Sequence, residues 1–262
     1  MKLPFAQIDA FADRPFGGNP AAVMPLDTWL SDDVLQAIAA ENNLSETAFT
    51  IQTDGDADYE LRWFTPACEV ALCGHATFAA GHHLLGEREA VRFRTRKAGV
   101  LEVRRDGAGY AMDLPATFMA PRPMPEVAAA LGVPDAPTWA SSTDAAEATV
   151  IILLDDEAAV RALQPDFRAL GQHHVMAVPT APGTDTDVVS RVFVPSFGID
   201  EDPVTGSAHA ALATFWAERL GRDSFTAFQA STRGGRLGCT QKGDRAVLSG
   251  ACVTVIEGEF LL

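Results

Sequence analysis

Three polar residues, far apart in the chain, have the side chains that proton transfer on a small acid requires. Glu46 lies between an expected helix and an apolar strand, in the segment Asn-Asn-Leu-Ser-Glu-Thr-Ala-Phe. His75 follows Gly74 at an expected helix start, and Asp202 precedes Pro203 just before a second helix start. A carboxylate or an imidazole within reach of a substrate proton can act as a general acid and base. These residues are therefore the candidates for proton-transfer chemistry.

Each of the three also has a purely structural interpretation. Glu46 could be a solvated loop acid, or it could pair with Asn43 in a helix-capping arrangement. His75 could make a local hydrogen bond at the helix start, where the positive end of the helix dipole favours a neutral imidazole. Asp202 could stabilise the dipole of the following helix by about 0.3–1 kcal/mol. The residue types alone leave both interpretations open.

Two expected helices begin at glycines, in residues Leu72–Ala76 and Thr205–Ala208. Such a helix start offers unpaired backbone N–H groups and the positive end of the dipole, which together bind carboxylates well. If two lobes of the chain face each other, both helix starts point into one cleft and hold a small anion from both sides. Single helix starts of this kind are usually structural, so the pairing carries the functional prediction.

Other chemistries have less support. Cys73 could be a thiolate base at the helix start, but no cysteine stands at the equivalent place near Pro203–Thr205, so we interpret it as a small buried residue. The spacing Cys68-x4-Cys73-x-His75 matches none of the common zinc signatures. The sequence contains neither a glycine-rich phosphate loop nor a Gly-x-Ser-x-Gly elbow.

A weak internal repeat indicates which elements position these residues. Residues 62–67 and 191–196 both fit Arg-x-Phe-x-Pro-small. In each half acids follow, then a glycine that opens a helix of small residues, then a basic turn at residues 95–99 or 231–235. Four matches in the same order, with a period of about 130 residues, favour duplication over chance similarity and predict two domains.

Apolar patterns predict mostly strands, with one long helix central to each half. The expected strands are Leu3–Ala10, Thr47–Gln52, Tyr59–Phe64, Val91–Thr95, Leu101–Val103, Thr149–Leu154, Val175–Val178, Val188–Val194, Phe225–Ala230 and Ala246–Ile256. The expected helices are Leu30–Glu41, His75–Leu85 and Ser207–Leu220, the last closed by Gly221. We predict an α+β fold of two pseudosymmetric lobes, each a curved, mostly antiparallel sheet wrapped around a central helix.

The proline-dense segment Pro115–Pro125 suits a linker between the lobes. We assign residues 1–118 to the N-terminal lobe, which the last strand, near residues 255–262, could also join. Residues 119–262 form the expected C-terminal lobe.

Composition excludes several classes of protein. The 262 residues carry 35 acidic and 20 basic side chains, a net charge of −15 spread over both halves, so neither a nucleic-acid module nor a membrane-binding patch is expected. A hydrophobic content of 47% excludes disorder. The N-terminus has no long apolar segment, and four cysteines are too few for a disulfide scaffold, so we expect a cytoplasmic protein with reduced thiols.

Several motifs together resemble those of one known family, over essentially the whole chain. They are Asp9-Ala-Phe11, Gly18-Asn19-Pro20-Ala-Ala-Val23, Asn43-Leu-Ser-Glu46-Thr-Ala-Phe49, Phe64-Thr-Pro66, Leu72-Cys-Gly-His-Ala-Thr77 and Asp202-Pro-Val-Thr-Gly-Ser-Ala208. In these motifs the chain resembles the PhzF family of phenazine-biosynthesis-like isomerases. The resemblance implies the diaminopimelate-epimerase-like fold.

The resemblance to the PhzF family also implies an isomerisation that uses no metal and no cofactor. The characterised relative isomerises trans-2,3-dihydro-3-hydroxyanthranilic acid by moving a hydrogen between ring carbons. Glu46 matches the glutamate that takes and returns the proton, and His75 and Asp202 match the residues that bind the substrate and assist the transfer. The residues that match substrate-binding groups are Asn19, Gly74, Gly206 and Ser207. Relatives are commonly cytoplasmic homodimers.

We therefore predict an isomerase that shifts a proton on a small cyclic or amino carboxylic acid, with Glu46 as general acid and base in a cleft between the lobes. Its expected partners are this small carboxylate and a second copy of the chain, with no nucleic acid and no membrane. Two alternatives stay open. One is an epimerase or racemase of a small amino or hydroxy acid, which would use Cys73 or Glu46 on one side and Asp202 or His75 on the other. The second is a non-catalytic protein that binds a small acid.

Overall fold

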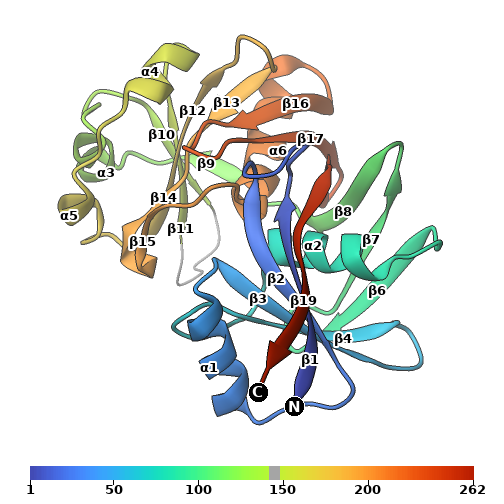
Figure 1. Ribbon diagram of the computed structural model, residues 1–262. Helices are drawn as coiled ribbons and strands as arrows, with labels where there is room; N and C mark the ends of the chain where they lie inside the picture. The colour runs from blue at the N-terminus through green and yellow to red at the C-terminus, as the bar shows by residue number, and fades with distance from the viewer. Residues whose placement is uncertain (142–147) are drawn as a thin grey trace. The chain divides into compact units, whose positions relative to one another are not determined.

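The computed structural model describes residues 1–141 and 148–262 (Figure 1). The fold is α+β, as predicted, and it divides into two compact units. Unit 1 comprises Met1–Leu114 and Ser249–Leu262, and unit 2 comprises Pro115–Leu248. The change of unit lies at Leu114–Pro115 in the structure and after residue 118 in the prediction. Within the described ranges, no helix is both long enough and apolar enough to cross a membrane.

In unit 1 a mixed sheet surrounds one helix. The strands are β1 (Lys2–Ala10), β2 (Asn19–Leu26), β3 (Glu46–Gln52), β4 (Tyr59–Phe64), β5 (Glu69–Val70), β6 (Ala90–Thr95), β7 (Val100–Asp106), β8 (Gly109–Pro115) and β19 (Cys252–Leu261), and the helices are α1 (Asp32–Asn42) and α2 (Gly74–Leu84). The strands pair in the order β19-β1-β2-β3-β4-β6-β7-β8, with β2–β3 and β4–β6 parallel and the other pairs antiparallel. Helix α2 contacts β1, β2, β3 and β7 and is buried along most of its length, so it forms the centre of the unit.

Unit 2 repeats this arrangement. Its strands are β9 (Met119–Pro121), β10 (Thr138–Ser141), β11 (Ala148–Leu153), β12 (Val175–Pro182), β13 (Val188–Ser190), β14 (Phe193–Val194), β15 (Ile199–Glu201), β16 (Ser224–Gln229), β17 (Gly235–Lys242) and β18 (Arg245–Gly250), and its helices are α3 (Pro125–Ala130), α4 (Glu157–Ala162), α5 (Phe167–Leu170) and α6 (Gly206–Leu220). The order β9-β10-β11-β12-β13-β16-β17 has parallel pairs at β11–β12 and β13–β16. The directions of the pairs follow the same sequence as from β19 to β7, so the internal repeat of the sequence is a repeat of the fold.

The repeated Arg-x-Phe motif has the same structural role in both units. In unit 1 the guanidinium of Arg62 donates from Nε and Nη2 to the two carboxylate oxygens of Glu69, at 2.8 and 2.9 Å, and lies 4.9 Å from the centre of the Phe64 ring. In unit 2 Arg191 donates in the same way to Glu201, at 2.8 and 3.0 Å, and lies 4.7 Å from the ring of Phe193. We call these two arrangements the Arg–Glu clamps. The first joins β4 to the short strand β5, and the second joins the segment between β13 and β14 to the short strand β15.

Two of the predicted strands are each divided into two strands in the structure. Residues 246–256 form two strands, because the carbonyl of Ala251 leaves the ladder and accepts a hydrogen bond from the backbone N–H of Ala12 at 3.0 Å. Residues 188–194 are likewise divided, because β13 pairs with β16 whereas β14 pairs with β15. In both places one of the two strands pairs with a partner that is distant in sequence, β19 with β1 and β13 with β16, and an apolar run gives no sign of it.

Candidate active site

The candidate residues of unit 1 lie at one edge of its sheet. Asn19 and Glu46 are the first residues of β2 and β3, which run parallel with Ala21 opposite Glu46 (Figure 1). Parallel neighbours begin at the same edge of a sheet, so both side chains lie at that edge. Helix α2 packs against both strands, and His75 is its second residue. The first residues of two strands and of one helix therefore meet in a small volume.

The chain reaches Glu46 through a tight turn after α1. Asn43 ends α1 in the left-handed conformation, with φ of 48°, which asparagine tolerates better than most residues. Its place at the C-terminal end of α1 means that the helix-capping interpretation of Asn43 and Glu46 is wrong. Glu46 instead begins a strand, with 17% of its side chain exposed.

Glu46 and His75 face each other. The Oε2 atom of Glu46 lies 3.0 Å from Nε2 of His75, whose side chain is 7% exposed. The two atoms are at ion-pair distance but out of line for a hydrogen bond, and within the described ranges neither atom has any other hydrogen-bond partner. Buried polar atoms are nearly always hydrogen-bonded, so a pair left in this state calls for a structural or functional explanation.

Asn19 and Ser45 hold the other side of the His75 ring. The hydroxyl of Ser45 donates to Oδ1 of Asn19 at 2.9 Å, which directs the NH₂ group of Asn19 to Nδ1 of His75 at 3.2 Å. An amide NH₂ can only donate, so in the neutral ring Nδ1 accepts and the proton is on Nε2. The Nε2–H group therefore faces the Glu46 carboxylate.

Cys73 touches the same ring. Its Sγ atom lies 3.6 Å from Nδ1 of His75, and burial raises the pKa of the thiol, with the nearby Glu46 charge adding to the effect. Burial also opposes a charged imidazole, but Cys73 and the Glu46 carboxylate outweigh it and raise the pKa of His75 well above its usual range. The expectation of a neutral His75 considered only the helix dipole, whereas a carboxylate oxygen that favours the charged ring lies 3.0 Å from it.

Glu46, Cys73 and His75 are also a group that could hold a metal ion. One ligand atom from each lies within 4.8 Å of the other two. However, the ring stands between its neighbours, with Nε2 toward Glu46 and Nδ1 toward Cys73. A histidine normally binds a given ion through one ring nitrogen, so an ion held by all three residues would require the ring to turn. The arrangement as it stands suits a proton better than a metal ion.

The candidate residues of unit 2 gather at the start of α6. The side chain of Asp202 accepts a hydrogen bond from the Thr205 hydroxyl, and its backbone carbonyl accepts one from Nε2 of Gln229 at 2.6 Å. The Oε1 atom of Gln229 in turn accepts from the backbone N–H of Thr205 at 2.9 Å. Asp202 is thereby fixed beside Gly206, the first residue of α6. Ser207 is exposed, and among the described residues its hydroxyl makes only a weak contact, 4.0 Å from the sulfur of Met176.

Among the described residues, neither helix start is capped by the residue before it. In the part of the chain that the structure describes, neither Cys73 before α2 nor Thr205 before α6 caps its helix with a side-chain hydrogen bond. No acidic residue lies in the first turn of either helix. The backbone N–H groups of both first turns are therefore not satisfied by the residue that usually does so.

The structure thus brings the predicted residues together in two groups, one in each unit. Asn19, Glu46, Gly74 and His75 belong to the first group, and Asp202, Gly206 and Ser207 belong to the second. Sequence reasoning missed Ser45, Thr205 and Gln229 and did not foresee that Cys73 touches His75. Ser45 and Thr205 adjoin residues that it did identify, and their hydroxyls were the available signal. Gln229 is the last residue of β16, and no motif near it in the sequence indicates its contact with Asp202 and Thr205.

The comparisons with known proteins agree on the family. The family model for phenazine biosynthesis-like protein matches residues 8–258. An uncharacterized isomerase of Pseudomonas aeruginosa is 48% identical, with the whole of both chains covered. The crystal structure of a phenazine biosynthesis protein of the PhzF family from Enterococcus faecalis superposes with a TM-score of 0.90 at 40% identity, again over the whole of both chains. The chain belongs to the PhzF family of phenazine biosynthesis-like proteins.

A more distant structure has the same fold. A hydroxyproline epimerase from Agrobacterium vitis superposes with a TM-score of 0.62 over 99% of this chain and 91% of its own. At 12% identity this likeness concerns the fold alone. The two-unit fold is therefore common to the PhzF family and to epimerases.

Proposed function

We propose that this protein is an isomerase that shifts a proton on a small cyclic or amino carboxylic acid. The observation that carries the proposal is the buried pair formed by Glu46 Oε2 and His75 Nε2, 3.0 Å apart and otherwise without hydrogen-bond partners in the described ranges. Membership of the PhzF family and the similarity to a protein named as an isomerase support it.

In the proposed reaction Glu46 removes a proton from a substrate carbon and returns it to another. The electron pair of the broken C–H bond moves into a new double bond, the existing double bond shifts, and the same carboxyl group delivers the proton at the far end. The Nε2–H group of His75 supplies a hydrogen bond to the charge that develops, and Asp202 orients the substrate. Substrate and product have the same atoms and the same oxidation state, so the step needs no oxidant or reductant.

We further propose that the substrate carboxylate binds between the two groups of residues, in a cleft between the units. The starts of α2 and α6, at Gly74 and Gly206, would donate backbone N–H groups to it, and Ser207 would add its hydroxyl. Asn19 would contact the substrate in addition to holding His75. This arrangement explains how a chain of net charge −15 could bind an acid.

The test of the proposal is Glu46→Gln. A well-placed general acid and base contributes about 10²–10⁴-fold to a rate, so this variant should lose most of the activity and keep its fold. Activity is measured by NMR in heavy water on a panel of cyclic and amino acids, and folding by circular dichroism. Glu41→Gln, at an exposed glutamate of α1, is the matched control. Equal activity in Glu46→Gln and the parent would end the proposal.

The contact between Cys73 and His75 keeps one alternative in view, an epimerase or racemase of a small amino or hydroxy acid. The same experiment distinguishes the two. Incorporation of deuterium with inversion at one carbon, abolished by Cys73→Ser, would favour the epimerase, and a migrated double bond would favour the isomerase. A ligand that binds tightly and is never converted would favour a non-catalytic binding protein.

The resemblance to the family also carries the proposal of a cytoplasmic homodimer. Light scattering after size-exclusion chromatography would give a mass of about twice 27.9 kDa. A monomer at working concentration would exclude it.

A further inference from the structure

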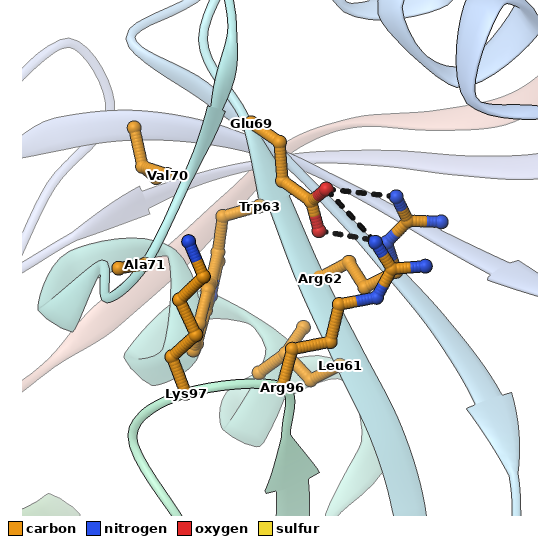
Figure 2. A pocket seen from close by; sticks show the side chains of 8 residues that line it. All are labelled: Leu61, Arg62, Trp63, Glu69, Val70, Ala71, Arg96 and Lys97. Atoms are coloured by element: carbon orange, nitrogen blue, oxygen red, sulfur yellow. Dashed lines mark hydrogen bonds and ion pairs between the residues drawn. The ribbon is translucent and has the colours of Figure 1, made fainter.

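A pocket in unit 1 shares no residue with the candidate active site (Figure 2). It has a volume of about 170 Å³ and is lined by residues 61–63 of β4, residues 69–71 at β5, and residues 96–97 in the turn between β6 and β7. We call it the Lys97 pocket. Its last segment is part of the basic turn that the internal repeat singles out and that the proposed function does not use.

The charges of the pocket are not balanced. Three cationic side chains line it, and they face one carboxylate, that of Glu69. Glu69 is bound by Arg62 through two hydrogen bonds and by Arg96 at 3.1 Å, as Figure 2 shows, and the Arg62 guanidinium holds the pKa of Glu69 below its usual range. Arg62 also pairs with Asp32 at 2.8 Å. Two carboxylates thus offset the two arginines, while Lys97 has no ion-pair partner among the described residues.

Trp63, one of the residues that line the pocket, also has a buried hydrogen-bond donor that lacks a partner. The indole of Trp63 is part of the lining, Trp63 is only 2% exposed, and its Nε1–H group meets no acceptor in residues 1–141 and 148–262. Elsewhere, the indole of Trp29 donates to Glu60 and that of Trp216 donates to Thr180. A buried donor without an acceptor calls for an explanation, and a bound group that accepts hydrogen bonds would supply one.

The turn that carries Arg96 and Lys97 is held in place. The hydroxyl of Thr95 accepts from the backbone N–H of Ala98 at 2.9 Å and donates to the carbonyl of Gly99 at 2.8 Å. Gly99 has φ of +74°, which closes the turn in a conformation that glycine adopts without strain. Both cationic residues are exposed but leave the sheet from a fixed backbone, so binding a ligand there costs little ordering of the backbone.

We propose that the Lys97 pocket binds a compact oxyanion such as inorganic phosphate. The ammonium group of Lys97 supplies the uncompensated charge, Arg96 supplies further N–H donors, and Trp63 supplies the unpartnered indole N–H. Pockets for drug-sized ligands have about 300–1,000 Å³, so a volume of about 170 Å³ favours an oxyanion of a few atoms over a nucleotide. The proposal does not depend on the proposed isomerase activity.

Two measurements on the full chain test the proposal. Isothermal titration calorimetry with inorganic phosphate, in a buffer without oxyanions, gives the Kd. The ¹⁵N–¹H NMR spectrum of the indole groups shows where on the protein phosphate binds. The chain has four tryptophans, and Trp63→Phe identifies the signal of Trp63. Phosphate should shift that signal and leave the signal of Trp216, which donates to Thr180 in unit 2, in place.

Variants of matched charge separate a built site from general attraction. Lys97→Gln should raise the Kd for phosphate about tenfold or more, whereas Lys242→Gln, which removes the same charge from β17, should not change it. A parallel titration with malonate distinguishes a phosphate site from a carboxylate site, and binding of either supports an oxyanion pocket. Absence of binding at about 10 mM of both anions would overturn the proposal. Equal weakening by Lys97→Gln and Lys242→Gln, or a Trp63 signal that does not move, would also overturn it.

Discussion

At the scale of single residues, the state of His75 depends on the groups that face its two nitrogens. Glu46 at Nε2 favours the charged ring, whereas the Asn19 NH₂ group at Nδ1 favours the neutral ring, because it needs an acceptor there. In either state Nε2 carries a proton and faces the carboxylate. Asn19 therefore acts on the proton balance of the pair through His75, in addition to any contact with substrate.

This role predicts the effect of Asn19→Leu. Loss of the donor to Nδ1 removes a hydrogen bond that stabilises the neutral imidazole, so the pKa of His75 should rise further above its usual range. An NMR titration of the six histidines measures it, with His75→Asn to assign the signal. Ser45→Ala should cause a smaller shift in the same direction, because it only frees the Asn19 amide to rotate. A lower pKa of His75 in Asn19→Leu would contradict this account.

Single residues also show how much of the candidate site could be predicted from the sequence. Glu46 and His75 could be identified because a carboxylate and an imidazole at the starts of elements are chemically conspicuous. The hydrogen bonds that link Ser45 through Asn19 to His75 could not be predicted from the sequence. They join three segments whose register is fixed only when β2 and β3 pair. The raised pKa of His75 was missed for the same reason. The sequence showed its helix but not the carboxylate opposite.

At the scale of elements, α2 is pressed against β7 at a glycine. A Cβ atom on Gly81 would lie 2.4 Å from Cγ1 and 2.5 Å from Cβ of Val103. In an exposed helix, alanine is about 1 kcal/mol better than glycine, but overpacking a core costs about 1–3 kcal/mol. We expect Gly81→Ala to lower the free energy of unfolding by about 1–2 kcal/mol in urea denaturation, against the helix propensity.

The control for this prediction is a substitution of Val103, the residue that the added Cβ atom would meet. In a Val103→Ala background the overlap with Cγ1 is removed and only the overlap with Cβ remains, so adding Gly81→Ala should cost less there than in the parent. Gly258→Ala in β19, where an added Cβ meets nothing within 4 Å, should leave stability nearly unchanged. An equal cost of Gly81→Ala in both backgrounds would show that the contact with Val103 is not the cause.

Helix α6 carries a buried histidine whose titration should be visible in stability. His209 is fully buried, its Nδ1–H donates to the Thr205 carbonyl at 2.8 Å, and burial lowers its pKa to about 4. An unfolded histidine has a pKa near 6.5, so between these values the unfolded state binds more protons. Stability from this residue is complete above pH 6.5 and is lost as the pH falls through 4, by about 3 kcal/mol.

His209→Asn should flatten that part of the curve. The Asn side chain can place an N–H group where Nδ1 stands and keep the bond to Thr205, but it does not titrate. Urea denaturation between pH 4 and 7 should therefore show a smaller loss of stability in the variant than in the parent. His174→Asn, at an exposed histidine, serves as the control and should leave the slope unchanged. A parallel fall in parent and His209→Asn would assign the acid sensitivity to other groups.

The elements were predicted best where one segment carries its own pattern. Strands such as Tyr59–Phe64 and the helix that closes at Gly221 follow from local periodicity and a glycine C-cap. The division between β18 and β19 does not, since β19 pairs with β1, at the other end of the sequence. The short elements β5 and β15 were missed as strands too. They are two and three residues long, and the Arg–Glu clamps rather than an apolar pattern hold them.

At the scale of the whole molecule, the fold is duplicated and each unit has one Arg–Glu clamp. Breaking either clamp therefore tests what the repeated motif contributes to the stability of its unit. Arg62 and Arg191 have side chains 3% and 14% exposed, and their glutamates 29% and 18%. Breaking a fully buried ion pair costs about 3–5 kcal/mol, and the partial exposure of the glutamates reduces this through solvent screening. We expect Arg62→Met and Arg191→Met each to lower the free energy of unfolding by about 1–3 kcal/mol.

The double variant carries the sharper expectation. The clamps lie in different units and share no partner, so the two losses should add to within about 0.5 kcal/mol in urea denaturation. Glu257→Gln, at an exposed glutamate of β19, is a control for the loss of a surface charge. Arg62→Met should cost somewhat more than Arg191→Met, because Arg62 also pairs with Asp32. A loss in one unit with none in the other would show that the repeated motif no longer has a repeated role, and a double loss far from the sum would show that the stabilities of the two units are coupled.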